Sequence, residues 1–217
     1  IASGLVATLA AVLSAWYLGW LLWPGRAGHP VLYVLLVAAE LFNLTQAVGF
    51  WWTLAGRRRA TAPDETRRHL PPTTTVDVLV PVYDEPVDVI AATVEAARDL
   101  RGADHRVVLC DDGCRDELRE LAADLDVGYL PREDSAGAKA GNINHALATT
   151  DGEFVVVFDS DHVVQPSFLE RTLPHFADPT IAFVQTPQYY ANDRDNEMAG
   201  TAWEQQALFF GPIARGK

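Results

Sequence analysis

The segment FVVVFDSDH, residues 154–162, joins an unbroken apolar run directly to two carboxylates. An apolar run without polar alternation is typical of a parallel strand that helices cover on both faces. Asp159 and Asp161 then follow the carboxyl end of that strand, the edge at which open α/β sheets bind their ligands. Carboxylate oxygens favour Mg²⁺ or Mn²⁺. The segment therefore predicts an α/β sheet with a metal at its edge, and a simple turn cap is the alternative for the Asp-x-Asp triplet.

Apolar runs and amphipathic stretches alternate from Val76 onward. This alternation is the pattern of βαβ units, in which the strands are parallel and the helices cover both faces of the sheet. It predicts an α/β, Rossmann-like fold with a mostly parallel sheet, and the absence of a GxGxxG fingerprint argues against a nicotinamide cofactor. The expected strands are 76–83, 105–110, 127–130, 153–158 and 181–185, and the expected helices are 86–101, 116–124 and two that begin near 141 and 166.

Two long apolar stretches precede this region. Residues 1–23 contain no charged side chain and end in aromatic residues, as a spanning helix with an interfacial aromatic belt does. Residues 31–55 form a second stretch, which Arg57, Arg58 and Arg59 follow. By the positive-inside rule, this basic cluster lies on the cytoplasmic side. We predict a two-helix transmembrane hairpin within residues 1–59 of a multi-pass protein of the inner or plasma membrane. A secretory signal peptide, the alternative for the first stretch, would need a basic n-region.

Three polar residues of the second stretch, Glu40, Asn43 and Gln46, recur at every third position and share one helical face. Polar groups within the lipid bilayer are costly unless they find protein partners. We therefore expect this face to pack against other transmembrane helices of the full-length protein. A hydrogen-bonding role is favoured over an ion path, because only Glu40 can ionise.

Charge and composition divide the chain further. The net charge is −12, and residues 1–60 carry four arginines and one glutamate, so the remaining residues carry −15. Such an acidic soluble part argues against nucleic-acid binding, which needs a basic face. Residues 60–75 hold three prolines without apolar periodicity and predict a linker before a cytoplasmic domain over 76–217. The chain begins without methionine and stops at Lys217, so we expect a piece of a longer protein whose domain is incomplete at its C-terminus.

Polar side chains follow three of the expected strands. The carboxyl ends of parallel strands meet at one edge of a sheet, so an aromatic ring and several carboxylates should converge there. Lys139 can add a cation for phosphate, because Gly137 and Gly141 allow close backbone approach and the next helix offers N–H groups to an anion. An ordinary glycine-bearing loop is the alternative. The residues at or just after the ends of these strands are Tyr83 and Glu85, then Asp111 and Asp112, then Asp159, Asp161 and His162.

With these motifs the chain resembles the processive family-2 glycosyltransferases, in particular bacterial cellulose synthase catalytic subunits. Five segments carry the resemblance in the same order and with comparable spacing over about residues 76–191: VDVLVPVYDEP, VVLCDDGC, AKAGNINHAL, VVVFDSDHV and FVQTPQYY. The resemblance implies a GT-A fold on the cytoplasmic face, after N-terminal membrane spans. It also implies an inverting, metal-dependent enzyme that transfers a sugar from a UDP-sugar donor to a growing β-linked glycan acceptor.

The resemblance implies roles for individual residues on the donor side. Tyr83 would stack on or beside the uracil ring, and Glu85 would belong to the same nucleotide-sugar-binding set. Either Asp111 or Asp112 would accept hydrogen bonds from the uridine. Lys139 would pair with the diphosphate.

On the metal side, the resemblance makes Asp159 and Asp161 the ligands of Mg²⁺ or Mn²⁺, with Asp159 also close to the nucleotide sugar. His162 would be either an additional metal ligand or a residue that orients the ligands or packs beside them. The family often has an aromatic residue or histidine where Gln188 stands, so the preference for an acceptor stays open. The residues that match the acceptor-side segment are Gln185, Thr186, Pro187 and Gln188.

Two motifs of the family do not occur in this sequence: a Thr-Glu-Asp-like motif with the general base, and a QxxRW motif at the acceptor platform. We therefore expect the general base beyond Lys217, and we expect this piece alone to bind donor nucleotide with very little turnover. Two alternatives remain, a single-transfer glycosyltransferase that modifies a lipid and a non-catalytic nucleotide-sensing membrane subunit. A phospho-accepting receiver domain would not explain FDSDH or the apolar hairpin.

Overall fold

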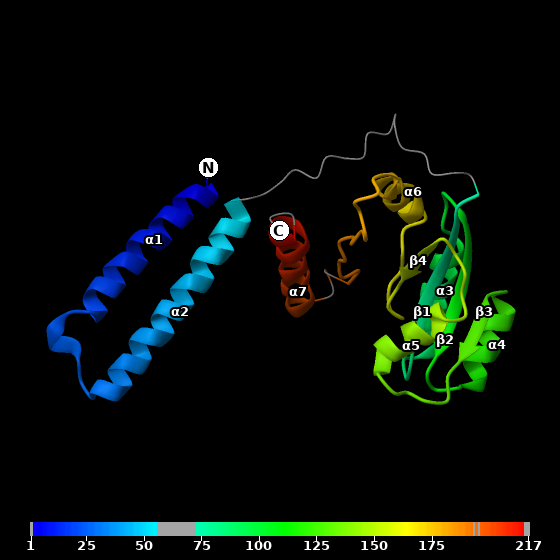
Figure 1. Ribbon diagram of the computed structural model, residues 1–217, viewed down its shortest axis with the longest axis horizontal. Helices are drawn as coiled ribbons and strands as arrows, with labels where there is room; N and C mark the ends of the chain where they lie inside the picture. The colour runs from blue at the N-terminus through cyan, green and yellow to red at the C-terminus, as the bar shows by residue number, and fades with distance from the viewer. Residues whose placement is uncertain (1, 56–72, 193, 195, 215–217) are drawn as a thin grey trace. The chain divides into compact units, whose positions relative to one another are not determined.

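The protein is described by a computed structural model that covers residues 2–55, 73–192, 194 and 196–214. It divides into two compact units, one made of Ile1–Thr61 and Gln185–Lys217 and the other of Ala62–Val184 (Figure 1). Most of the predicted linker 60–75, and the predicted basic cluster at residues 57–59, lie outside the described residues. The proposed domain boundaries therefore stay predictions.

The first unit contains an antiparallel helical hairpin, formed by α1 (Ala2–Leu21), the short 3-10 turn η1 (Pro24–Arg26) and α2 (Pro30–Ala55) (Figure 1). Two side-chain hydrogen bonds join the helices: Tyr33 Oη donates to the carbonyl of Leu21 at 2.9 Å, and Tyr17 Oη donates to Glu40 Oε1 at 3.0 Å. The predicted polar face of α2 therefore has one partner inside the hairpin. The stretch Pro30–Thr53 is long and apolar enough to cross a membrane, with a mean hydropathy of 1.8, and the apolar part of α1, Leu5–Leu21, is shorter.

The same unit contains α7 (Glu197–Leu208), which a π-helical turn η3 (Phe209–Ile213) continues. Asn196 caps α7, because its Oδ1 accepts a hydrogen bond from the backbone N–H of Ala199 at 2.9 Å. Leu208 and Phe209 are 44% and 46% exposed.

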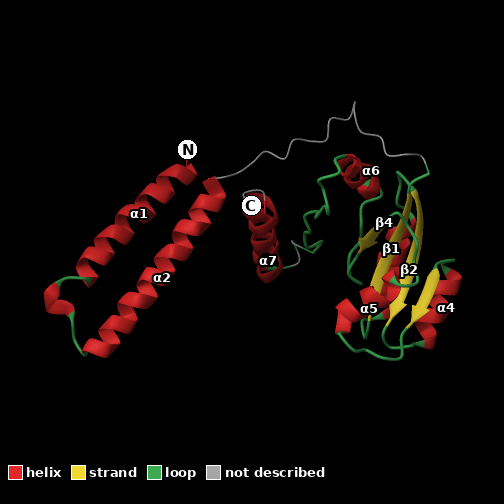
Figure 2. Ribbon diagram, in the orientation of Figure 1, coloured by secondary structure: helices red, strands yellow, loops and turns green. Residues whose placement is uncertain are grey.

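The second unit is built on a four-stranded parallel sheet in the order β3-β2-β1-β4 (Figure 2). Its central strand β1 is buried at seven of its eight positions, which explains why it is apolar on both faces. The register aligns Val82 at the end of β1 with Asp111 at the end of β2, and Asp111 with Pro131 of β3. The strands are β1 (Thr75–Val82), β2 (Asp104–Asp111), β3 (Gly128–Pro131) and β4 (Phe154–Val157).

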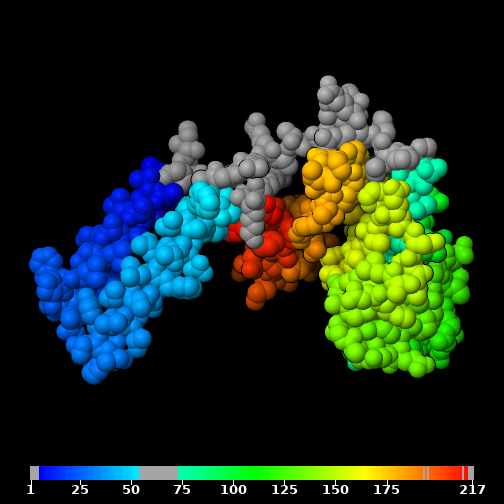
Figure 3. Space-filling model, viewed as in Figure 1, coloured from blue at the N-terminus to red at the C-terminus, as the bar shows by residue number. Residues whose placement is uncertain are grey.

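Helices cover both faces of this sheet and make a three-layer α/β domain. Valines 76, 78, 80 and 82 of β1 point to one face, where they pack against α3 (Val87–Arg98), α4 (Asp116–Asp124) and α6 (Phe168–Thr172). Leu79 and Cys110 point to the other face and pack against α5 (Ala138–Leu147). The chain segment that carries α5 covers much of the near face of this unit in Figure 3. The predicted α/β fold with a parallel sheet is thus confirmed. The strand before Asp159 differs from the prediction, because Val155 and Val157 of β4 are each 40% exposed and only one face of this strand is covered.

One predicted strand is wrong. Residues 181–185 carry no regular secondary structure, and Ile181 and Phe183 are 38% and 78% exposed. Within the described residues the sheet ends at β4 and this apolar run pairs with none of its strands, so its backbone groups form no ladder. The helix expected near Pro166 is also reduced, to the five residues of α6 and the following 3-10 turn η2 (Leu173–Ala177).

A buried carboxylate links three segments at the edge of the sheet that holds the amino ends of the strands. Asp77 of β1 is 2% exposed and accepts hydrogen bonds from Arg106 Nε of β2 at 3.0 Å and from the backbone N–H of Gly152 at 2.6 Å. Gly152 lies in the turn before β4. Because burying a charge is costly unless it is paired and hydrogen-bonded, this set of contacts fixes three adjacent segments relative to one another.

Replacing this carboxylate should destabilise the fold. We expect Asp77→Ala to lower the free energy of unfolding by about 2 kcal/mol, because it leaves the partly buried N–H of Gly152 and one side of Arg106 without their acceptor. Asp151→Ala is the matched control, since Asp151 also pairs with Arg106 but its side chain is 95% exposed; it should change stability by less than about 0.5 kcal/mol. Urea unfolding of the full chain in detergent measures both. Equal losses in the two variants would contradict this account.

Candidate functional site

The ends of β1, β2 and β4 and the start of α5 enclose a cleft of about 530 Å³. The sheet register brings these segments together, because parallel strands deliver their carboxyl ends to the same edge. Six of the residues predicted from the sequence line this cleft: Tyr83, Glu85, Asp112, Lys139, Asp159 and Asp161.

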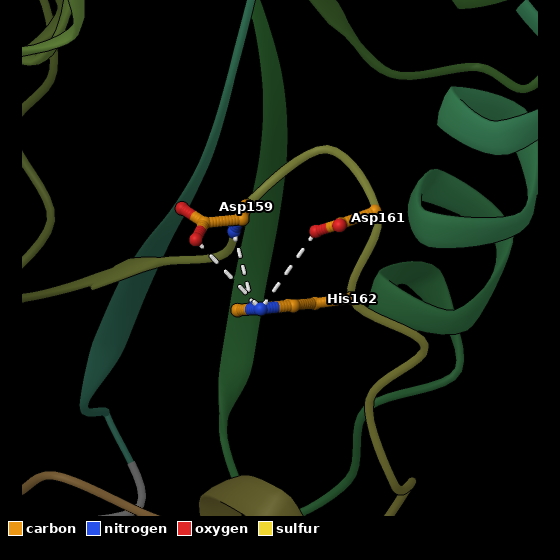
Figure 4. Close-up of side chains that lie close together, drawn as sticks. All are labelled: Asp159, Asp161 and His162. Atoms are coloured by element: carbon orange, nitrogen blue, oxygen red, sulfur yellow. Dashed lines mark hydrogen bonds and ion pairs between the residues drawn. The ribbon is translucent and has the colours of Figure 1, made fainter. Parts of the chain in front are cut away.

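The two carboxylates of the FDSDH segment lie close to the following histidine (Figure 4). Asp159, Asp161 and His162 each place one ligand-type atom so that all three lie within 4.8 Å of one another. Two carboxylates and an imidazole at this separation form a donor set that fits a divalent metal ion. Asp159 and Asp161 could hold the ion as oxygen ligands, and this role stays a prediction.

The ring of His162 lies between these carboxylates. Its Nε2 is 3.7 Å from Asp159 Oδ2 and 3.8 Å from Asp161 Oδ1, and its Nδ1 accepts a hydrogen bond from the backbone N–H of Asp159 at 3.3 Å (Figure 4). A neutral imidazole whose Nδ1 accepts carries its proton on Nε2, which here faces the carboxylates. Of the two roles expected for His162, this geometry favours the one in which the ring orients the carboxylates.

Lys139 lies in the first turn of α5, and its side chain extends to the carboxylate of Asp159. Its Nζ forms an ion pair with Asp159, and both side chains are about half exposed to the cleft. Gly137 precedes the helix with φ +77°, a left-handed conformation that suits glycine. Gly141 allows a close approach, since a Cβ there would lie 2.0 Å from the carbonyl oxygen of Ala136. The glycines noted in the sequence thus let the loop fold tightly onto the helix that carries the cation.

The structure distinguishes the two adjacent aspartates at the carboxyl end of β2. Asp111 is fully buried, and its oxygens accept hydrogen bonds from the backbone N–H groups of Gly113 and Arg115 at 2.8 and 2.7 Å and from Tyr129 Oη at 2.8 Å. Burial and this last hydrogen bond raise the pKa of Tyr129 to about 12, so its hydroxyl remains a donor. Asp111 therefore holds the turn, whereas Asp112 lines the cleft.

Arg132 is a site residue that the sequence did not reveal. Its Nε and Nη2 donate to the two oxygens of Asp112 at 2.5 and 2.6 Å and so form a bidentate pair. The side chain of Arg132 is 11% exposed and that of Asp112 is 5% exposed. Arg132 also donates to the carbonyl oxygens of Ala136 and Ala138 at 2.8 and 3.2 Å. The hydrogen bond to Asp112 raises the pKa of Arg132 and keeps it charged. A lone arginine after a short strand gives no signal, because its partners lie in other loops.

Glu85 holds the loop after β1. Its Oε2 accepts a hydrogen bond from the backbone N–H of Tyr83 at 2.8 Å, while the ring of Tyr83 is 62% exposed. Partial burial would raise the pKa of Glu85, but hydrogen bonds from the Tyr83 backbone, its own backbone and the Ser160 side chain, together with the charge of Arg115, outweigh it and lower that pKa. Glu85 therefore connects the aromatic loop to the FDSDH segment.

The expected acceptor-side residues belong to the other compact unit, whose second segment begins at Gln185. The chain has no regular secondary structure there, and three of the four residues are exposed. Their role stays a prediction. The residues are Gln185, Thr186, Pro187 and Gln188.

Comparison with known sequences decides the family. Residues 77–215 match the family described as "Glycosyl transferase family 2". The chain belongs to this family.

Two curated relatives of this family-2 chain are cellulose synthase catalytic subunits [UDP-forming], from Xanthomonas axonopodis pv. citri (strain 306) and Pseudomonas fluorescens (strain SBW25). The first is 35% identical and covers 88% of this chain and 27% of its own length, and the second is 40% identical and covers 83% and 25%. The chain thus spans about a quarter of the length of these relatives.

A solved structure also resembles this family-2 chain. It is a mannosyltransferase from Pyrobaculum calidifontis in complex with GDP-Man and Mn²⁺, with a TM-score of 0.51 and 24% identity over 65% of this chain and 43% of that one. At this level of identity the similarity supports the fold. The glycosyltransferase fold expected from the motifs is therefore found in both comparisons.

The lowered pKa of Glu85 makes a prediction about acid stability. A carboxylate with a lowered folded-state pKa stabilises the fold above its ordinary value of 4.5, and this contribution is lost as the pH falls through the lowered pKa. The loss in melting temperature caused by Glu85→Gln should thus be largest near neutral pH and shrink in acid. Ser160→Ala removes one donor and should give a smaller difference of the same sign. A difference that does not change with pH would contradict this assignment.

Proposed function

We propose that this chain carries the donor-binding part of a membrane-bound, metal-dependent, inverting glycosyltransferase that transfers a sugar from a UDP-sugar to a growing β-linked polysaccharide. The observation that carries this proposal is the meeting of Lys139 with Asp159 and Asp161 in a cleft that also contains Tyr83. An aromatic ring, a cation and two metal-binding carboxylates are the groups that a nucleoside diphosphate requires. Relatives named as UDP-forming cellulose synthase subunits support the choice of UDP and of a β-glucan.

Each side chain would have a distinct part in donor binding. The exposed ring of Tyr83 would stack against the uracil, and Asp112, held in place by Arg132, would accept hydrogen bonds from the uridine. Lys139 would exchange part of its pairing with Asp159 for the diphosphate oxygens. Mg²⁺ or Mn²⁺ at Asp159 and Asp161 would neutralise negative charge on the departing UDP.

The remaining parts of the enzyme follow from the family resemblance. The acceptor hydroxyl would attack the anomeric carbon from the side opposite to UDP, which inverts the configuration. The proton of that hydroxyl would go to a general base in a part of the protein beyond Lys217. Gln185 to Gln188 would lie on the acceptor side.

The apolar hairpin would anchor the enzyme in the inner or plasma membrane. Pro30–Thr53 has the length and hydropathy of a spanning helix, and Arg57 to Arg59 would keep the following domain in the cytoplasm. Asn43 and Gln46 are exposed on α2, and we propose that they contact other transmembrane helices of the full-length, multi-pass protein.

The metal site can be tested by removing one charge. Asp161→Asn keeps the shape of the side chain but removes its negative charge, so it should weaken Mn²⁺-dependent UDP binding at least about tenfold without unfolding the protein. Calorimetric titration of the chain in detergent, with Mn²⁺ and then with EDTA, measures the effect. Asp124→Asn, on the exposed side of α4, is the matched control and should bind as the wild type does. Unchanged affinity in Asp161→Asn would refute the assignment of the metal site.

The activity requires the full-length gene product in membranes. We expect it to release UDP from one member of a panel of UDP-sugars, with Mg²⁺ but not with EDTA, and to lengthen a glycan. Release without a lengthening glycan would point to single transfer onto a lipid. No release from any donor by intact protein would favour the non-catalytic nucleotide-sensing subunit.

A further inference from the structure

A buried hydrogen bond holds the residue between the two metal-binding carboxylates. Ser160 is 6% exposed, and its carbonyl oxygen accepts a hydrogen bond from Thr93 Oγ1 at 2.7 Å. Thr93 is distant in the sequence and lies in the middle of α3, where it is fully buried. It therefore contacts neither the cleft nor any ligand within it.

The position of this hydroxyl is fixed by the hydrophobic core. Ile90, Val94 and Ala97 of α3 are fully buried against β1, so the helix cannot shift without disturbing the core. The contact from Thr93 to the carbonyl of Val89, at 3.4 Å, is much longer than the one to Ser160. Since a hydroxyl has one proton to donate, the Ser160 carbonyl is the acceptor that the geometry favours.

The side chain of Ser160 also has a neighbour at the cleft, in addition to the contact of its carbonyl with Thr93. The side chain of Ser160 lowers the pKa of Glu85, both residues line the cleft, and Glu85 accepts the backbone N–H of Tyr83. The carbonyl of Ser160 belongs to the peptide group that leads into Asp161, so its direction sets where the second carboxylate begins. Thr93 thus determines the orientation of a peptide group between the two carboxylates, at the point where the FDSDH segment meets the aromatic loop.

We propose that Thr93 is a positioning residue for the metal site: its hydroxyl fixes the peptide plane between Asp159 and Asp161 and so presets the distance and direction of the two carboxylates. This proposal rests on the proposed function. Groups that orient metal ligands without touching the metal commonly change its affinity by about 10- to 100-fold. An unpaired Ser160 carbonyl would remain buried, and the turn would have to move to satisfy it.

The test compares variants of the full chain in detergent by titration with Mn²⁺, with the free ion followed by electron paramagnetic resonance. Thr93→Val keeps the shape but removes the hydroxyl, and it should weaken Mn²⁺ binding about tenfold. Thr93→Ser keeps the hydroxyl and should restore the wild-type affinity. Thr172→Val is the matched control, because Thr172 is 7% exposed and its Oγ1 donates at 2.8 Å to Phe168 within its own helix. It should leave Mn²⁺ binding unchanged.

The outcomes separate this proposal from the one on which it rests. Wild-type affinity in a folded Thr93→Val protein, or equal weakening in Thr93→Val and Thr172→Val, would overturn the role of Thr93 while leaving the metal site intact. Absence of Mn²⁺ binding in the wild type would overturn the metal site itself, and the role of Thr93 with it. If Thr93→Val does not fold, Thr93→Ala makes the same comparison, with the same weakening expected and the same rescue by serine.

Discussion

The parallel pairing of β1 with β2 and β4 is the constraint on which the candidate site depends. The register aligns Val82 with Asp111, so the loops after β1 and β2 begin side by side. β4 pairs with the other edge of β1 and delivers the FDSDH segment to the same cleft. A shift of this register would separate Tyr83 from the carboxylates, because each loop begins where its strand ends. The buried Asp77 contacts, at the opposite end of the sheet, hold the same three segments in place.

The loops at the cleft are held by hydrogen bonds that mostly do not involve the proposed ligand-binding atoms. Arg132 fixes Asp112 and the loop before α5, Glu85 fixes the backbone at Tyr83, and Thr93 fixes Ser160. The ring of Tyr83 and the side chain of Lys139 stay about half or more exposed in the same region. A rigid frame with exposed recognition groups lowers the entropic cost of ordering a ligand when it binds.

The sequence predicted the parts of this site that depend on local patterns. The apolar run before Asp159 indicated a strand covered on both faces; the strand forms as β4, but Val155 and Val157 are each 40% exposed, so only one face is covered. The glycines around Lys139 were expected to let the backbone approach a ligand, and in the structure Gly141 admits the carbonyl oxygen of Ala136. Arg132 and Thr93 gave no local signal, because their roles depend on partners in distant segments. The run at 181–185 was predicted as a strand because it is apolar, but a strand also needs a neighbour for its backbone hydrogen bonds. The choice between Asp111 and Asp112 likewise required the contacts of their carboxylates.

We infer that the three strand ends form one donor-nucleotide site. The most direct measurement is an anomalous-scattering map of Mn²⁺ in crystals of the protein grown with UDP. We predict a manganese peak at the carboxylates of Asp159 and Asp161, with the diphosphate beside Lys139 and the uracil against Tyr83. A nucleotide bound outside this cleft, or a manganese peak away from both carboxylates, would contradict the account.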